Sequence, residues 1–163
     1  MEKVAEEAPV SKRTLYAHFR TKNDLVIAHL QSLVLSGATL ERALTREDAS
    51  LWERILMLFD QLTADAGLVR GCPFIDAAAE FPDPESAVHS YAREQKLRMA
   101  QLIAALVTEL GCREPLAFAE QMATLADGAA SRAKVFGEAN YGRHARAAAE
   151  VLLEHALPDS DGP

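Results

Sequence analysis

The stretch Val4–Leu25 constrains the fold more than any other part of this sequence, because it consists of short helical segments separated by breaks. Residues 1–8 form a short amphipathic segment, and Pro9 ends it, since the proline ring fixes φ and restricts the preceding residue. Ser11 offers an N-cap oxygen to a second short helix, which we expect to run to about Phe19. Two short helices joined by a tight turn, the second bearing basic and hydroxyl side chains, are typical of a helix-turn-helix that binds DNA.

The run AEEAPVSKRTLYAHFRTKNDL resembles the DNA-binding half of the TetR family of transcriptional repressors. That family has an Ala-Glu-x-Ala-Gly-Val-Ser turn, a Thr-Leu-Tyr-x-x-Phe recognition helix and a Lys-x-x-Leu entry to the next helix. The matching residues are Ala5, Glu6, Ala8, Val10, Ser11, Thr14, Leu15, Tyr16, Phe19, Lys22 and Leu25. Pro9 stands where the family usually has Gly. The run GCPFIDAAAEFPDP, at 71–84, also resembles the ligand-binding half of some members.

The resemblance implies which side chains would contact DNA. These residues are Ser11, Lys12, Arg13, Thr14, Tyr16 and Lys22. The first would cap the recognition helix, and the next two would face base edges, since Arg is suited to bidentate contact with guanine. The last three would hold phosphates, Lys22 being assisted by the positive N-terminal end of its helix, for which Thr21 is the expected N-cap.

The TetR resemblance also implies a further helix, packed across the apolar face of this pair. The sequence as given begins inside the first helix of the pair, so we expect the further helix, which is the first helix of the family's DNA-binding half, to be absent and the face to be uncovered. The uncovered residues would be Val4, Ala8, Leu15 and Phe19. Two functional readings follow: a regulator that binds DNA, or a dimeric small-molecule-binding module that does not bind DNA because the first helix is missing.

The net charge of −7 is unevenly distributed along the chain. Residues 1–22 contain five basic and three acidic residues, a net charge of +2, whereas the remainder contains 12 basic and 21 acidic residues, a net charge of −9. No acidic residue lies between Ser11 and Lys22. Positive charge concentrated on one helix suits phosphate binding, because the interaction is screened beyond about 8–10 Å at physiological salt.

Composition predicts an all-α protein, since Ala and Leu are abundant, aromatic residues make up 6%, and β-branched runs are few. The helices expected after the recognition helix span about 22–44 with a bend at Gly37, 50–66 with Gly67 as its stop, 74–81, 84–110, 115–136 and 141–157, followed by a frayed tail at 158–163. Asp83 is the expected N-cap of the 84–110 helix. We therefore predict a partial helix-turn-helix domain at 1–24 and a helical effector-binding and dimerisation domain at 25–163.

The last two helices have unusually small faces, which include Ala126 and Ala148. The resemblance implies that they pair with their symmetry mates in a four-helix homodimer bundle, and the alternative is that they pack within one chain. A two-fold dimer would place two recognition helices in major grooves about 34–36 Å apart, so the predicted DNA partner is a palindromic double-stranded operator.

A group of aromatic and Met residues is predicted to line a cavity for a small-molecule effector, since Met adapts to irregular ligand shapes. The group consists of Phe59, Phe74, Phe81, Tyr91, Met99, Phe118 and Met122. Plain core packing is the alternative for each of them. With a DNA-binding half and a cavity, the chain is interpreted as a repressor released from its operator by a small molecule, with helix 22–44 as the lever.

Other protein classes are disfavoured. No uncharged apolar run of 18 residues is present, and no basic n-region begins a signal peptide, so we expect neither a membrane partner nor export. Cys72 and Cys112 fit a reducing cytosol, and we expect a cytoplasmic protein. No phosphate loop, zinc-protease or nucleophile-elbow motif occurs, so we expect no enzyme, metal or cofactor. Asp76, Glu80 and His89 would at most converge near one pocket, and capping or solvent exposure is the favoured reading.

Overall fold

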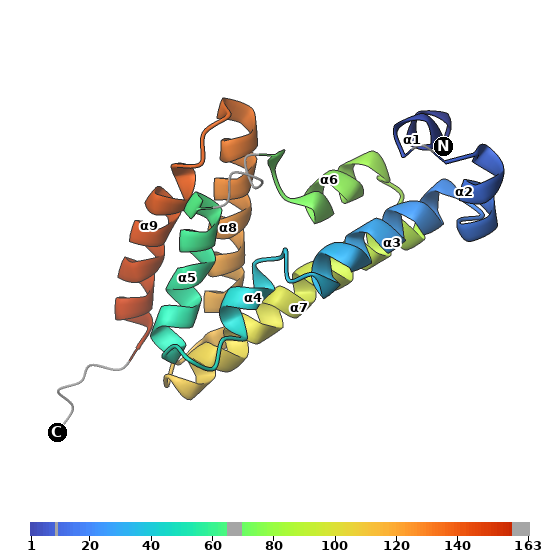
Figure 1. Ribbon diagram of the computed structural model, residues 1–163. Coiled ribbons are helices and arrows are strands. Elements are labelled where there is room, and N and C mark those ends of the chain that lie inside the picture. Colours follow the sequence, from blue (N-terminus) through green and yellow to red (C-terminus); the bar gives the residue numbers. More distant parts are fainter. Residues whose placement is uncertain (9, 65–69, 158–163) are drawn as a thin grey trace, which may run out of the picture.

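The computed structural model describes residues 1–8, 10–64 and 70–157. Within these ranges the regular secondary structure consists of helices, with no β-strand. The helices of the described part are α1 (Glu2–Glu7), α2 (Lys12–His18), α3 (Lys22–Leu35), α4 (Glu41–Leu44), α5 (Leu51–Ala64), α6 (Pro73–Glu80), α7 (Ala87–Glu109), α8 (Pro115–Phe136) and α9 (Tyr141–Ala156). The molecule is elongated, with α1 and α2 at one end and α5, α8 and α9 at the other (Figure 1). The predicted all-α fold is confirmed.

Local capping explains where the N-terminal helices begin. The Ser11 hydroxyl accepts a hydrogen bond from the Thr14 amide at 3.0 Å, which caps α2. Thr21 and Asp24 form a reciprocal capping box at the start of α3, with amide-to-side-chain distances of 2.9 and 3.1 Å. Both predicted caps are confirmed, and the predicted break at Pro9 lies outside the described residues.

The single helix predicted at 22–44 is wrong, because α3 ends at Leu35 and a separate short α4 follows. Gly37 has a φ of +68°, a left-handed conformation that L side chains rarely adopt. The Gly37 amide bonds to the Val34 carbonyl and the Ala38 amide bonds to the Leu33 carbonyl, which forms a Schellman motif. The glycine expected to bend the helix therefore terminates it.

The predicted start of the helix after Pro84 is also wrong, since α7 begins at Ala87. The Asp83 carboxylate accepts a hydrogen bond from the Glu85 amide at 3.0 Å. The backbone carbonyl of Asp83 accepts a second one from the Ser86 amide, also at 3.0 Å. Asp83 therefore stabilises a turn before the helix rather than the helix itself. Helix α5 is described to Ala64, and the predicted helix end at 66, the Gly67 stop and the tail at 158–163 lie outside the described residues.

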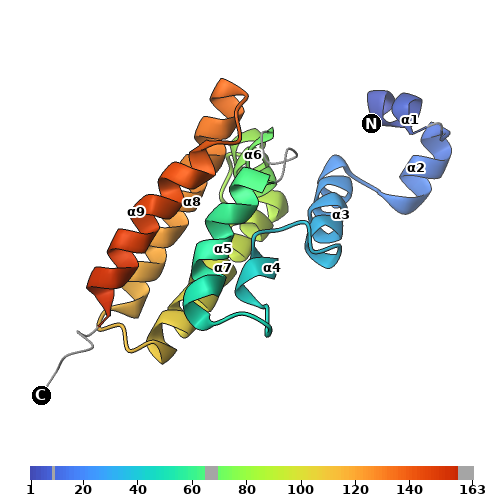
Figure 2. The same cartoon turned by 60° about the vertical axis from the view of Figure 1, so that its left-hand side comes forward.

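Buried side chains form two hydrophobic clusters that α7 connects. The larger cluster fills the bundle of α5, α7, α8 and α9, where Phe59, Ile103 and Leu153 are 0% exposed. The smaller cluster lies among α3, α6 and α7 and contains Leu30, Phe74, Ala77, Val88 and Ala92. Each large side chain buried in this way contributes about 1.5–3 kcal/mol to folding. Figure 2 shows the bundle on one side and α1 and α2 on the other.

The alanine face of α8 is buried within the chain, against α7 and α9. Ala126 is 0% exposed, so the expectation that it lies at a dimer seam is wrong, because neighbouring helices of the same chain already cover it. Ala148 on α9 is exposed. The alternative of packing within one chain therefore holds for the buried stripe and leaves the outer faces of α8 and α9 at the surface.

Candidate nucleic-acid interface and ligand pocket

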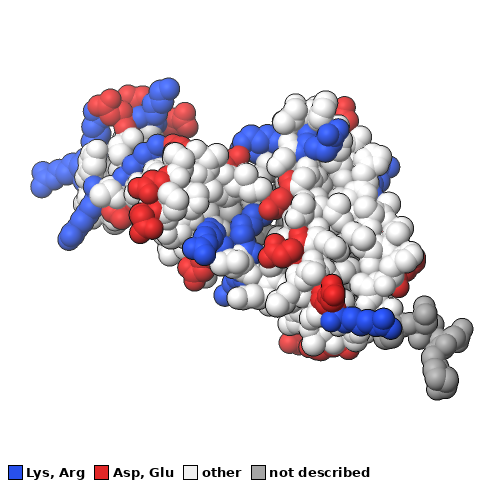
Figure 3. Space-filling model, turned by 180° about the vertical axis from the view of Figure 1, so that it is seen from behind, with Lys and Arg blue, Asp and Glu red and all other residues white. Residues whose placement is uncertain are grey.

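Helix α2 presents its polar side chains to solvent and anchors itself through one apolar residue. Leu15 is 7% exposed, whereas Arg13 and Thr14 are exposed and Tyr16 is 51% exposed. Basic side chains project from this end of the molecule, interspersed with acidic ones (Figure 3). The arrangement offers hydroxyl and guanidinium donors on a short helix at the tip of the chain, which suits contact with a DNA groove.

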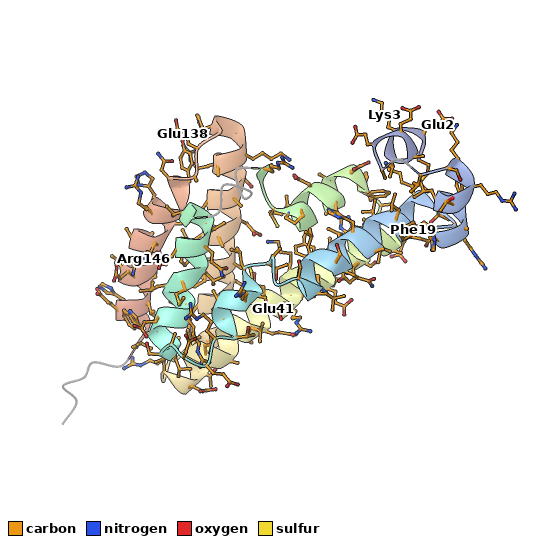
Figure 4. All side chains as sticks on the ribbon, in the orientation of Figure 1. Glu2, Lys3, Phe19, Glu41, Glu138 and Arg146 are labelled. Carbon is orange, nitrogen blue, oxygen red and sulfur yellow. The ribbon has the colours of Figure 1, made fainter. Side chains whose placement is uncertain are left out.

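Three of the predicted contacts, Ser11, Lys12 and Thr14, are already engaged with neighbours at the tip. The Lys12 ammonium pairs with the Glu2 carboxylate of α1, and this hydrogen bond and charge hold the pKa of the Glu2 carboxyl below its ordinary value. The Thr14 hydroxyl lies 2.8 Å from the Ser11 hydroxyl. Figure 4 labels Glu2 beside Lys3 at this end of the molecule. Arg13 forms no ion pair with any described residue, so its guanidinium is available for a ligand.

Lys22 occupies the first position of α3 and has a partner that local sequence does not reveal. Its ammonium pairs with the Glu80 carboxylate, 58 residues later at the end of α6, and lies 5.2 Å from the Phe81 ring centroid. Both members of the ion pair are more than half exposed. The predicted phosphate-binding residue is therefore connected to α6, and only the packing of α6 beside α3 brings the two charges together.

A pocket of about 50 Å³ lies where α6, α7 and α8 meet the segment between α3 and α4. Its wall includes Thr39, Glu41, Cys72, Phe74, Lys96, Met99 and Asp127. The wall is mainly apolar and carries a few polar groups, as is usual for ligand sites. The space is smaller than an engineered protein cavity of ~150 Å³ that binds benzene, so a ligand larger than the present space requires the wall to move.

The structure separates the seven residues predicted to line a cavity. Phe74 and Met99 line the pocket. Phe59, Phe118 and Met122 belong to the bundle core and are at most 3% exposed, and Phe81 and Tyr91 pack against the smaller cluster. Burial raises the pKa of the Tyr91 phenol, with the Glu94 charge as a further cause. These five do not line the pocket, because their helical positions face other neighbours.

The polar groups of the pocket were not identified from the sequence. Lys96 on α7 pairs with Asp127 on α8, and their side chains are 25% and 33% exposed. Glu41 is labelled in Figure 4 at α4, where its 16%-exposed side chain accepts a hydrogen bond from Arg98 at 2.6 Å. No local motif signals these groups, because each pair joins residues far apart in the sequence.

The three residues considered as an acidic and histidine cluster have separate partners. Asp76 pairs with Lys134 at 2.5 Å, Glu80 pairs with Lys22, and the His89 Nδ1 atom lies 2.9 Å from the Phe81 carbonyl oxygen. Within the described ranges, no group of three or more His, Cys, Asp or Glu residues is arranged to hold a metal ion. None of the described helices combines the length and the apolar character needed to span a membrane.

A helix pair at one end, whose second helix is capped by Ser11, and a helical bundle with a pocket at the other define a class of DNA-binding regulators. The family profile described as "Bacterial regulatory proteins, tetR family" matches residues 1–29, and that described as "Tetracyclin repressor-like, C-terminal domain" matches residues 52–149. The chain belongs to the TetR family of transcriptional regulators.

The chain is also similar in sequence to a curated regulator and in structure to solved proteins of this family. The HTH-type transcriptional regulator YjdC of Escherichia coli (strain K12) is 30% identical over 101 residues, which cover 53% of this chain and 53% of YjdC. The chain thus spans about half the length of the curated relatives it matches. A TetR-type regulator of Streptomyces avermitilis MA-4680 is 28% identical, with a TM-score of 0.82 over 96% of this chain and 86% of that one.

The same fold occurs in a more distant structure. SCO4454, a TetR-family transcriptional regulator of Streptomyces coelicolor, is 24% identical and has a TM-score of 0.83 over 95% of this chain and 83% of that one. At this identity the likeness concerns the fold alone. It covers nearly the whole chain, so the arrangement of the helix pair beside the bundle is shared.

Proposed function

We propose that this chain is a ligand-responsive repressor that binds a palindromic double-stranded operator and is released from it by a small molecule. The observation that carries the proposal is α2, where Ser11 caps the helix, Leu15 is buried, and Arg13 and Tyr16 face solvent. A short helix exposed in this way at the tip of the molecule has the form of a recognition helix. Its operator would lie in the cytoplasm, where we expect the protein to act.

Each predicted DNA contact has a role that follows from its chemistry. Lys12 and Arg13 would face base edges, and Arg13 suits bidentate contact with guanine. Thr14, Tyr16 and Lys22 would bind phosphates, which sets the orientation on the duplex. Exposed ion pairs are weak, so the pair that Lys12 forms with α1 would not prevent contact with DNA.

A homodimer through the outer faces of α8 and α9 is the second part of the proposal. These faces carry uncharged residues, with Val135 77% and Val151 53% exposed. The other residues of this stripe include Thr124, Gly128, Ser131, Ala147 and Ala148. Figure 3 shows a broad uncharged area on the half of the molecule that contains these helices. Small uncharged side chains allow two helices to approach a second copy closely, and two-fold symmetry matches a palindromic site.

The pocket beneath α6 is the proposed effector site. Its wall includes the start of α6 at Cys72, Pro73 and Phe74, whereas the far end of α6 contacts Lys22 at the start of α3. A ligand larger than the present space would push against α6. Because the end of α6 contacts Lys22, a displacement of α6 would also displace the start of α3. We propose domains at 1–24 and 25–163, a boundary that lies within α3, so that one continuous helix joins them.

A second candidate is a dimeric small-molecule-binding module that does not bind DNA. The observation that favours it is the engagement of Lys12 and Lys22 with carboxylates of the same chain, which lowers the charge available to phosphates. The two candidates differ in a single measurable property, the binding of duplex DNA.

Selection from a random duplex library, followed by anisotropy titration of the enriched sequences, distinguishes them. The repressor proposal predicts an enriched palindrome with half-sites one helical turn apart, and binding that weakens steeply with salt. Arg13→Ala is the test variant, and Arg143→Ala is its control, because Arg143 is an exposed arginine on α9 at the other end of the molecule. Absence of enrichment and of binding at low salt favours the second candidate.

A further inference from the structure

The pairing of Lys22 with Glu80 concerns the same ammonium that the proposed function assigns to a DNA phosphate. The Nζ atom of Lys22 is within hydrogen-bonding distance of the Glu80 carboxylate, and it lies 5.2 Å from the centroid of the Phe81 ring. Two groups at the end of α6 therefore hold one cation at the start of α3. This ammonium belongs to the first residue of α3, where a phosphate is also favoured by the helix dipole.

The backbone position of Glu80 is fixed by the burial of the helix that carries it. Phe74 and Ala77 on α6 are 8% and 7% exposed and belong to the cluster shared with α3 and α7. At the other side, Asp76 on α6 pairs with Lys134 on α8 at 2.5 Å. Because packing fixes α6, the Glu80 carboxylate cannot leave the start of α3 without a movement of the helix or a change of side-chain rotamer.

We propose that Glu80 is an intramolecular competitor for the phosphate that Lys22 binds, and that it sets the DNA affinity of this chain. The proposal rests on the proposed function, since it requires Lys22 to contact DNA. When a phosphate approaches Lys22, the ammonium either leaves Glu80 or is shared between the carboxylate and the phosphate. Both alternatives weaken binding. Removing the Glu80 charge removes the competition and leaves Lys22 in place.

The exposure of the pair limits the size of this effect. The side chains of Lys22 and Glu80 are 56% and 58% exposed, and ion pairs at this exposure are weak. The expected gain in affinity on neutralising Glu80 is therefore about two- to five-fold. A competitor of this strength adjusts the affinity rather than abolishing binding.

The test compares Glu80→Gln, Lys22→Ala and the double variant with the unaltered chain. The probe is a fluorescein-labelled duplex of mixed sequence, roughly 30 base pairs long, titrated by anisotropy at several KCl concentrations. We expect Glu80→Gln to tighten binding about two- to five-fold, and Lys22→Ala to weaken it and reduce the salt slope by about 0.9. When Lys22→Ala is already present, adding Glu80→Gln should change the affinity by less than about 1.5-fold, because the competition needs the ammonium.

Glu85→Gln is the matched control for the removal of one negative charge. Glu85 lies in the loop that follows α6, is exposed, and forms no ion pair with any described residue. Its substitution should change the affinity by less than about 1.5-fold, because no cation is released. A gain equal to that of Glu80→Gln, or a gain from Glu80→Gln that persists together with Lys22→Ala, would mean a general charge effect and would overturn the proposal.

The outcome also separates this proposal from the proposed function. If the unaltered chain binds the duplex and Glu80→Gln binds no more tightly, the competition is absent and the proposed function stands. If no chain binds the duplex even at the lowest salt, the assignment of Lys22 to a phosphate fails and both proposals are overturned. Circular dichroism of each variant gives the thermal midpoint, which should be unchanged because both substituted side chains are exposed.

Discussion

Gly142 on α9 lies so close to Thr63 on α5 that no side chain fits between the two helices. A Cβ atom built on Gly142 would be 2.4 Å from the Thr63 Oγ1 atom and 2.6 Å from the Phe59 carbonyl oxygen. The second of these is a backbone atom that cannot rotate away. The absence of a side chain at Gly142 therefore permits the close approach of α5 and α9 that completes the bundle.

Gly142→Ala should destabilise the fold by about 1–2 kcal/mol. Overpacking costs about 1–3 kcal/mol, and the better helix propensity of Ala offsets up to about 1 kcal/mol of that cost. Gly128→Ala is the comparison, because nothing in the same chain lies within 4 Å of a Cβ at that helical position. Both substitutions are made in the Ala148→Glu background, so that the proposed dimer does not contribute and only the propensity gain applies to Gly128→Ala. Urea unfolding at one protein concentration measures both. Equal signs for the two variants would show that α5 and α9 can separate at little cost.

Glu at Ala148 should split the proposed dimer and leave the protomer folded. Ala148 is exposed on one protomer, and a charge at a dimer seam would be buried without a partner. Multi-angle light scattering should give the mass of one chain for Ala148→Glu and of two chains for Ala105→Glu, an exposed control on α7. An unchanged dimer mass for Ala148→Glu would remove α9 from the interface.

Glu at Ala126 should have a different consequence. This residue is 0% exposed inside the protomer, so the charge would be buried in the core of a single chain. The expected result is loss of the cooperative thermal transition in circular dichroism, rather than dissociation into folded monomers. A folded monomeric Ala126→Glu would contradict the packing of α8 against its neighbours.

Arg13→Ala should relax sequence preference, whereas Lys22→Ala should weaken binding to every sequence. A bidentate contact with guanine discriminates by about 1–3 kcal/mol, and a phosphate contact contributes mainly to the salt dependence. Titration of each variant against the selected duplex and a scrambled duplex, at two salt concentrations, separates the two effects. A change in specificity without a change in salt slope for Lys22→Ala would mean that Lys22 contacts a base instead.

The N-terminal helices should exchange their amide protons faster than the bundle. Within residues 1–20, described except for position 9, only Ala5 and Leu15 are buried, and helices of six and seven residues are marginal without tertiary packing. Local opening free energies should be near zero in α2 and large in α7 between Leu102 and Leu106. Hydrogen exchange followed by NMR reports both regions in one sample. Equal protection would mean that α2 has a cover that the described contacts do not supply.

Several features of this protein follow from the sequence because the interactions that produce them are local. Ser11 and Thr21 cap their helices through groups three residues away, and Pro115 and Gly137 delimit α8 through their own backbone preferences. The prediction at Gly37 was wrong because a glycine fits either a bend or a helix end. The positive φ angle of Gly37 in the folded chain shows that the helix ends there.

Which distant groups come into contact depends on the packing of the helices. Glu80 reaches Lys22 across 58 residues, and Asp127 reaches Lys96 across 31, because α6 and α8 pack in fixed positions against their neighbours. The same packing determines that Ala126 is buried and Ala148 exposed, although both belong to alanine-rich stripes. Helical periodicity defines the faces of each helix, but the neighbour that each face meets depends on the burial of apolar surface summed over the whole chain.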